Sequence, residues 1–279
     1  MKKQTLLERL LQEGWFATEK EAASWVMMRR VLIDGQIITG LKEKVSSDGE
    51  IRIKEYYKRK YVNKGGLKLE SALDSFKVDV KGKVALDCGA STGGFTDCLL
   101  QHGAARVYAV DVGFGQLAGK LRQNPAVVNM EKTNLGDEVL RTLEPAPEVI
   151  SLDLSYLSLK KGVPLCKNIL KDGTGIVICL VKPLFEVESA DTRRTGTIGG
   201  PEVYKEILED LCGFFLKENF QIMGVSNSSV TGNAGTLEYF IALRLGEDKE
   251  GPASLETDLT QQINMAVECA MKLERFEKT

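Results

Sequence analysis

The chain has 279 residues, of which 43% are hydrophobic and 27% are charged. This composition is ordinary for a globular protein, and the length suffices for one sizeable core with a smaller domain beside it. No apolar run approaches the roughly 20 residues that a membrane-spanning helix needs, so no membrane association is expected. The N-terminus has charged residues inside its apolar stretch, unlike a signal peptide, and a cytoplasmic location is expected.

The cysteines and the single histidine argue against a metal site. The six cysteines include no Cys-x-x-Cys pair and are Cys88, Cys98, Cys166, Cys179, Cys212 and Cys269. Several stand in apolar runs, which predicts buried free thiols of a reducing compartment rather than disulfides or zinc ligands. The single histidine, His102, excludes a His-rich metal centre and is expected only to end a helix. No metal is therefore predicted.

Charge is distributed unevenly along the chain, although the net charge is only −2. Residues 1–68 hold 15 basic and 9 acidic side chains, whereas residues 247–279 hold 4 basic and 8 acidic ones. A basic front is typical of a protein that presents one face to a polyanion. An excess of lysine is also common on ordinary protein surfaces, so this feature alone does not decide the function.

Residues 1–60 are predicted to form a compact α+β module. Four leucines repeat at helical spacing before Gly14, namely Leu6, Leu7, Leu10 and Leu11. Thr18 and Glu21 then have the spacing of a capping box at the start of a second helix. Two short strands are expected within residues 31–38 and 50–57, with an Asp-Gly turn inside the first run.

This module resembles the RNA-binding domain first described in ribosomal protein S-four, through the basic end of its second helix and the Val-Leu-Ile-Asp-Gly run after it. The resemblance implies phosphate contacts at Lys20, Arg29, Arg30, Lys42 and Lys44. The following linker, residues 54–64, interleaves basic residues with three tyrosines, and tyrosine beside lysine can stack on bases while charge holds the backbone. Lys58, Arg59 and Lys60 are therefore further RNA-binding candidates, with a solvated linker as the alternative.

From Lys83 onward, strand-like and helical runs alternate, which predicts a doubly wound α/β domain over residues 83–246. Seven strands are expected, and the short connection before the last one predicts that this strand runs antiparallel to its neighbour. Residues 61–82 are expected to form a basic linker and a leading helix. Residues 247–279 are expected to form an acidic linker and an amphipathic helix that packs on the domain or on a second copy. A monomer or weak homodimer is predicted.

The segment from Asp87 to Phe95 leaves a buried strand, passes through glycines and starts a helix, which is the pattern of a ligand-binding turn. Asp111 follows Gly89 by 22 residues, where an acid can bind ribose hydroxyls, and an NAD-binding domain would share both features. The seven-strand count with its terminal hairpin is similar to that of Rossmann-like methyltransferases and favours S-adenosylmethionine. The expected cofactor contacts are Asp87, Gly89, Ser91, Thr92, Gly93, Gly94, Phe95, Asp111, Val112, Asn134 and Asp153.

Sheet geometry gathers four charged residues near this turn, because ligands of open α/β sheets bind beyond the carboxyl ends of the strands. Asp153 and Lys182 lie at the ends of the fourth and fifth expected strands. Glu238 opens the antiparallel last strand, and Lys68 stands at the start of the leading helix. Four ordinary ion pairs are the alternative interpretation.

These four residues carry the sharpest resemblance. They match the Lys-Asp-Lys-Glu tetrad of the FtsJ-type ribose 2′-O-methyltransferases, in the runs Gly-Gly-Leu-Lys, Ser-Leu-Asp-Leu, Leu-Val-Lys-Pro and Thr-Leu-Glu-Tyr. The run Asp-Cys-Gly-Ala-Ser-Thr-Gly-Gly-Phe is similar to that of the TlyA family, often labelled hemolysins, over about residues 5–246. The resemblance implies methylation of ribosomal RNA or ribosomal subunits, on cytidine. The loop after Lys182 departs from the family, since it lacks the Gly-Lys-Gly-Gly-Val stretch of relatives.

The tetrad suits the chemistry of a ribose hydroxyl, which is too weakly acidic to attack a methyl group readily. A lysine whose pKa is depressed by burial and a neighbouring cation can accept the proton. Lys182 is the candidate base, Lys68 the second cation, and Asp153 and Glu238 would orient the lysines.

Three other functions stay open at this point. An RNA-binding factor without catalysis is disfavoured by the intact tetrad. A membrane-active hemolysin is disfavoured because no spanning helix is expected. A small-molecule methyltransferase would leave the basic N-terminal module without a role.

Overall fold

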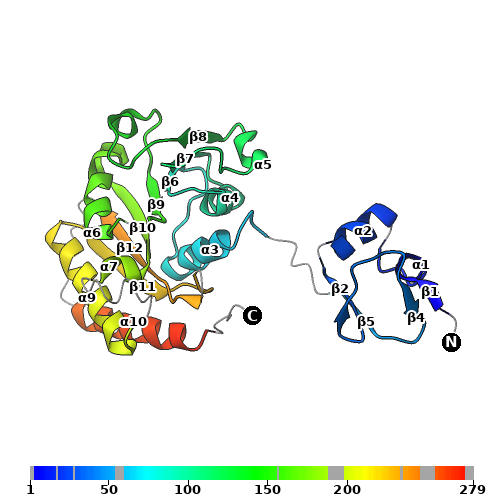
Figure 1. The fold of residues 1–279 in the computed structure, drawn as a ribbon. Helices are drawn as coiled ribbons and strands as arrows, with labels where there is room; N and C mark the ends of the chain where they lie inside the picture. Colours follow the sequence, from blue (N-terminus) through cyan, green and yellow to red (C-terminus); the bar gives the residue numbers. More distant parts are fainter. Residues whose placement is uncertain are drawn as a thin grey trace. The chain divides into compact units, whose positions relative to one another are not determined.

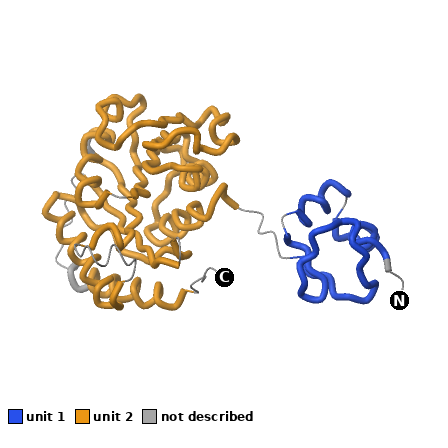
Figure 2. Tube along the Cα trace, viewed as in Figure 1, with its two compact units in different colours: residues 1–59 blue, residues 60–279 orange. Residues whose placement is uncertain are grey.

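The computed structural model describes residues 3–16, 18–27, 29–53, 60–155, 157–187, 198–232, 235–245 and 255–273. The chain divides into two compact units, residues 1–59 and residues 60–279 (Figure 2). The leading helix and the C-terminal helix that the sequence predicts both belong to the second unit.

The first unit is a small α+β module (Figure 1). Its elements are β1 (Lys3–Thr5), α1 (Leu6–Gln12), α2 (Glu19–Met27), β2 (Val31–Ile33), β3 (Gln36–Ile37), β4 (Lys44–Ser46) and β5 (Ile51–Ile53). The strands form a three-stranded sheet in the order β3-β2-β5 and a separate β1-β4 pair. Leucines of α1 and apolar residues of α2 and β2 share one core, which includes Leu6, Leu10, Val26 and Val31.

Local sequence signals explain where these elements begin. The Thr18 hydroxyl accepts the Glu21 N–H at 3.2 Å, as the predicted cap requires. The Asp34-Gly35 turn has φ angles of 51° and 79°, the left-handed pair that a two-residue hairpin needs. The first helix begins at Leu6, where the leucine pattern starts, because Thr5 and Glu8 form a capping box and residues 3–5 pair with β4.

The second unit is built on a seven-stranded sheet in the order β11-β12-β10-β9-β6-β7-β8. Its strands are β6 (Val84–Cys88), β7 (Arg106–Asp111), β8 (Val127–Glu131), β9 (Val149–Leu152), β10 (Gly175–Val181), β11 (Gln221–Asn227) and β12 (Tyr239–Leu245). The strands β6 to β10 are parallel, and β12 runs antiparallel to both β10 and β11. The predicted strand count and the antiparallel last strand are therefore confirmed.

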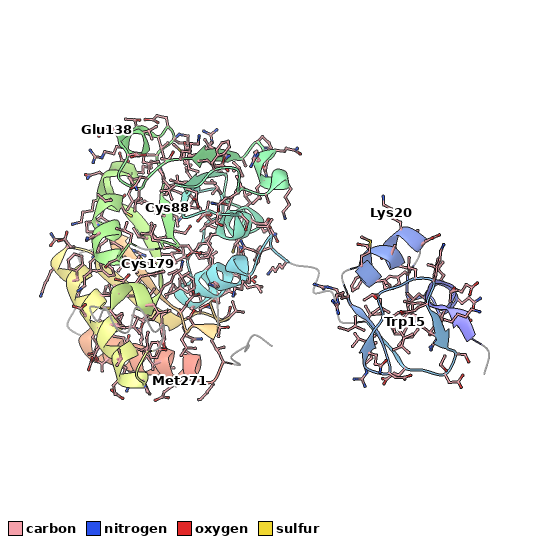
Figure 3. All side chains as sticks on the ribbon, viewed as in Figure 1. Trp15, Lys20, Cys88, Glu138, Cys179 and Met271 are labelled. Atoms are coloured by element: carbon pink, nitrogen blue, oxygen red, sulfur yellow. The ribbon has the colours of Figure 1, made fainter. Side chains whose placement is uncertain are left out.

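Helices cover both faces of this sheet (Figure 1). The helices are α3 (Gly65–Phe76), α4 (Gly94–Gln101), α5 (Gly119–Arg122), α6 (Leu159–Gly162), α7 (Pro183–Glu186), α9 (Pro201–Lys217) and α10 (Leu255–Met271). One face packs on α3 and α4, and the other packs on α6 and α9. Cys88 and Cys179 lie within these layers as buried free thiols (Figure 3). The helices α5 and α6 are single turns of four residues each.

The C-terminal helix packs on its own domain, as one of the two expected arrangements. Ile263, Val267 and Ala270 of α10 are buried in the main core, and α10 contacts β11 and α9. The Gln262 side chain accepts the Val225 N–H of the edge strand β11 at 3.0 Å. At an exposed sheet edge this N–H would have no hydrogen-bond partner in the protein, and the Gln262 side chain supplies one. Among the described residues, no helix has the length and apolar composition to cross a membrane.

Candidate active site

Four predicted catalytic residues meet at one edge of the sheet because of strand register. Val181 lies opposite Tyr239 in the β10–β12 pair, so Lys182 and Glu238 occupy the next positions beyond that pair. Asp153 follows Leu152 at the end of β9, and its N–H donates to the Cys88 carbonyl at 2.9 Å. The carboxyl ends of β6, β9 and β10 and the beginning of β12 therefore lie along the same edge of the sheet.

The four side chains form two ion pairs of different character. Lys182 Nζ lies 2.5 Å from Asp153 Oδ1 and donates to the Ser155 hydroxyl at 3.1 Å. These two side chains are 19% and 25% exposed, so solvent reaches both of them, although the paired oxygen Asp153 Oδ1 is itself buried. Lys68 and Glu238 form a second close ion pair, whose side chains are only 8% and 6% exposed. The site thus combines an accessible ammonium–carboxylate pair with a buried one.

The glycine-rich turn after β6 lies beside the accessible pair. Gly89 has a φ of 87°, and a Cβ atom there would overlap the Asp153 carbonyl. Gly93 has a φ of 96°, and a Cβ atom there would overlap the Leu121 side chain. Position 89 therefore requires glycine for both its left-handed backbone and its close approach to the Asp153 carbonyl, whereas position 93 requires glycine for its left-handed backbone.

Asp111 connects this turn to the next loop. One of its carboxylate oxygens accepts the Ser91 N–H and the other accepts the Gly113 N–H, both at 2.7 Å. Val112 follows on the same loop and is 69% exposed, which leaves an apolar surface open next to the acid. Asn134 lies exposed after β8, where its side-chain oxygen accepts the Gly136 N–H at 3.1 Å.

A residue that the sequence analysis missed lies over the turn. Asn63 donates from Nδ2 to the Thr92 hydroxyl at 2.5 Å and accepts the Gly65 N–H at 2.6 Å. A Cβ atom at Gly94 would overlap the Asn63 side chain. The only sequence signal was a polar residue directly before the Lys-Gly-Gly run that opens α3.

The side chains of two predicted cofactor contacts, Asp87 and Phe95, point into the interior. The Asp87 carboxylate is fully buried and accepts hydrogen bonds from the Thr96 hydroxyl at 2.6 Å and the Ser151 hydroxyl at 3.2 Å. Phe95 is buried and packs against Phe240, with ring centroids 6.2 Å apart. Both side chains pack in the interior of the domain, beneath the turn, and do not line its surface. Burial raises the pKa of Asp87 to about 7, and the nearby Asp153 charge adds to this rise.

Asp87→Asn is expected to remove a pH-dependent loss of stability. The folded Asp87 keeps its proton up to a pKa of about 7, whereas the unfolded carboxyl ionises near 3.8. Between these values the folded state binds more protons, so the free energy of unfolding falls as pH rises, by up to about 4 kcal/mol. Urea denaturation at pH 5 and pH 8 would measure about 3 kcal/mol of this fall, the part that lies between pH 5 and the pKa of about 7. An equal pH dependence in wild type and variant would contradict the prediction. The chain's two tryptophans, Trp15 and Trp25, lie in the first unit, so tryptophan fluorescence would report the unfolding of that unit. Unfolding of the second unit, which contains Asp87, should therefore be followed by far-ultraviolet circular dichroism.

The predicted RNA-binding residues are spread over both units. In the first unit, Lys20, Arg29, Lys42 and Lys44 are exposed and Arg30 is half-buried; Lys20 projects from α2 (Figure 3). Lys58 and Arg59 lie outside the described residues. Lys60 belongs to the second unit, where its ammonium pairs with Glu70 and its carbonyl accepts Gln101 Nε2 at 2.8 Å. Lys60 therefore fastens the start of this unit to α3 and α4.

Comparison with known proteins places this architecture in a family. The family model described as FtsJ-like methyltransferase matches residues 61–245. A Bacillus subtilis protein provisionally named as the rRNA methyltransferase YqxC is 37% identical over 272 residues, covering 95% of this chain and 94% of that protein. The Mycobacterium tuberculosis protein named 16S/23S rRNA (cytidine-2′-O)-methyltransferase TlyA is 33% identical over 240 residues, covering 86% of this chain and 89% of TlyA.

A solved structure that is similar in sequence also has a similar fold. A Streptococcus thermophilus structure, provisionally named a hemolysin, superposes with a TM-score of 0.71 at 34% identity. The match covers 98% of this chain and 97% of that structure. The seven-stranded topology agrees with the family match. The chain belongs to the FtsJ-like methyltransferase family.

Proposed function

We propose that the chain transfers a methyl group from S-adenosylmethionine to a ribose 2′-hydroxyl of ribosomal RNA. The observation that carries the proposal is the accessible Lys182–Asp153 pair at the carboxyl edge of the sheet, beside a turn whose glycines are required by geometry. The curated relatives YqxC and TlyA are named for rRNA methylation, and TlyA for the cytidine 2′-hydroxyl. The proposal therefore takes cytidine as the nucleotide and the cytoplasm as the place of action.

The glycine-rich turn and the loops beside it fit the proposed cofactor. Gly89 and Gly93 leave two positions of the turn without side chains, Asp111 presents a carboxylate between two loops, and Val112 offers an open apolar surface. These are the groups that an amino-acid tail, a ribose and an adenine would need. When bound, S-adenosylmethionine supplies a methyl group that is activated by a positively charged sulfur.

The chain's own residues have to position the hydroxyl and remove its proton. The Lys182 ammonium is held by Asp153 and Ser155, and in its neutral form its amine can accept the proton as the ribose oxygen bonds to carbon. Holding the oxygen in line with the methyl group supplies much of the acceleration in such a displacement. The buried Lys68–Glu238 pair joins α3 to the start of β12 and keeps a second ammonium at the same edge.

The first unit is the proposed RNA-binding module. Its resemblance to the S-four-type domain is supported by two helices packed with a small sheet and by the exposed basic residues Lys20, Arg29, Lys42 and Lys44. Such residues would hold RNA phosphates and bring the target nucleotide within reach of the enzyme.

Charge reversal at Lys20 and Lys42 together is expected to weaken RNA binding by at least about tenfold at moderate salt. Each lost phosphate contact should also lower the slope of log affinity against log salt by about 1. Filter binding to ribosomal RNA across a salt series would measure both effects. The double change Lys81→Glu/Lys217→Glu, at two exposed positions of the second unit, makes the same charge change there and should leave the slope unchanged. Equal effects of both changes would show a general response to charge rather than contacts in the first unit.

The proposal is tested by methyl transfer itself. Purified protein and labelled S-adenosylmethionine are incubated with ribosomal subunits and, separately, with protein-free ribosomal RNA. The expected result is label on a cytidine ribose, identified by nuclease digestion and mass spectrometry. Label on a base would overturn the ribose assignment. RNA binding without any label would instead support an RNA-binding factor without catalysis.

A further inference from the structure

The loop between β11 and β12 is fastened to the start of α3 by Lys64. Lys64 directly precedes α3, and its ammonium donates to the carbonyls of Thr231 at 3.1 Å and Gly232 at 2.9 Å. A second contact comes from the Ser229 hydroxyl, which donates to the Leu67 carbonyl at 3.1 Å. The segment 228–232 therefore rests on the N-terminal turn of α3.

The same segment packs against one side of Glu238. A Cβ atom at Gly232 would overlap Glu238 Oε1, so the carboxylate lies directly against the loop backbone. The Ser228 N–H also donates to the Glu238 carbonyl at 2.9 Å. The other carboxylate oxygen, Oε2, pairs with Lys68. Displacement of this loop would remove one side of the enclosure that holds Glu238 against Lys68.

Lys64 and Lys68 place two ammonium groups beside one carboxylate. They are four residues apart at the start of a helix, a spacing that puts side chains on the same face. Burial lowers the pKa of Lys64, the Lys68 charge lowers it further, and the Glu238 carboxylate opposes both. The electrostatic coupling agrees with the geometry in placing Lys64 close to the buried pair of the tetrad.

We propose that Lys64 is a positioning residue of the active site, which latches the β11–β12 loop to α3 and thereby holds Glu238 against Lys68. Its hydrogen bonds go to backbone carbonyls and not to a tetrad side chain, so its action on the reaction is indirect. The catalytic part of this inference rests on the proposed methyl transfer. The contact between Lys64 and the loop can be measured without substrate, by hydrogen exchange.

The test compares Lys64→Met, Lys64→Arg and a control, Lys81→Met, which removes an exposed lysine of the same unit. Lys64→Met is expected to lower kcat for methyl transfer by about tenfold or more through misplacement of the tetrad, with little change in the KM for RNA. Lys64→Arg keeps donors for two carbonyls and should restore most of the rate. Hydrogen exchange of the backbone over residues 226–238 should rise in Lys64→Met only.

Each result decides the proposal. An unchanged kcat for Lys64→Met beside an active wild type would overturn the positioning role. A raised KM for RNA with an unchanged kcat would overturn it in favour of direct substrate contact. If the wild type methylates no RNA tested, the proposed function is what has failed, and hydrogen exchange alone then decides whether the latch exists. Unchanged exchange in Lys64→Met would overturn the latch.

Discussion

Replacement of Lys182 by alanine is expected to lower the rate of methyl transfer by about 1,000-fold, which lies within the range for loss of a general base. Lys182 is the lysine of the accessible ion pair, and its ammonium lies within reach of both Asp153 and the Ser155 hydroxyl. Loss of the side chain removes the proton acceptor but leaves the sheet intact. Single-turnover transfer of labelled methyl to ribosomal subunits would measure the chemical step directly.

Lys182→Arg distinguishes proton transfer from charge. Arginine keeps the positive charge and several donors but does not act as a base, because its guanidinium stays protonated. We therefore expect Lys182→Arg to be nearly as slow as Lys182→Ala. Lys205→Ala, which removes a partly exposed lysine that pairs with Glu202 on α9, is the matched control and should keep the wild-type rate. An active Lys182→Arg variant would show that the residue acts by charge or orientation alone.

The sheet and the position of the tetrad could be predicted because they follow from short-range patterns. Apolar runs bounded by glycine and charged residues mark each strand of the parallel sheet, and alternation with helices fixes strand direction. Once the last strand is antiparallel, Asp153, Lys182 and Glu238 must come to the same edge. Which acid pairs with which lysine does not follow from this argument. The structure pairs Lys182 with Asp153 and Lys68 with Glu238.

The features that the sequence did not indicate depend on long-range contacts or on complete burial. The strand β1 has three residues and exists through its pairing with β4, about 40 residues away. In β6 every residue is buried, so no alternation of polar and apolar positions indicated that Asp87 faces Thr96 and Ser151. The contact of Lys64 with Gly232 spans 168 residues, and a single lysine before a helix gives no sign of it.

The first helix shows how a charged residue in a sequence pattern can have a structural role. Arg9 is buried, and its guanidinium donates to the carbonyls of Ser46 at 2.6 Å and Gly49 at 2.7 Å. It also pairs with Glu13 at 2.6 Å. This basic residue of the first unit, the proposed RNA-binding module, therefore ties α1 to the turn before β5, in contrast to the exposed Lys20 and Lys42. Counting basic residues along the sequence does not separate these two roles.

Removal of Glu238 is expected to have the largest effect on stability, because it leaves the Lys68 ammonium buried without its partner. Breaking a buried ion pair from one side costs about 3–5 kcal/mol, since the remaining charge is neither solvated nor compensated. Glu238→Ala should therefore lower the free energy of unfolding by about that amount and abolish methyl transfer. Urea denaturation followed by circular dichroism, together with the methyl-transfer assay, would measure both consequences.

The double variant Lys68→Met/Glu238→Leu separates the two roles of this pair. Replacing both charges by apolar side chains of similar length removes the uncompensated ammonium, and such replacements are often neutral or stabilising. Stability should therefore return to near the wild-type value while methyl transfer stays absent, because the second ammonium at the sheet edge is lost. Recovery of methyl transfer along with stability would mean that the buried pair only supports the fold, and that Lys182 and Asp153 suffice for the chemistry. A loss below about 1 kcal/mol in Glu238→Ala would show that water reaches Lys68 in solution, as it does in exposed pairs.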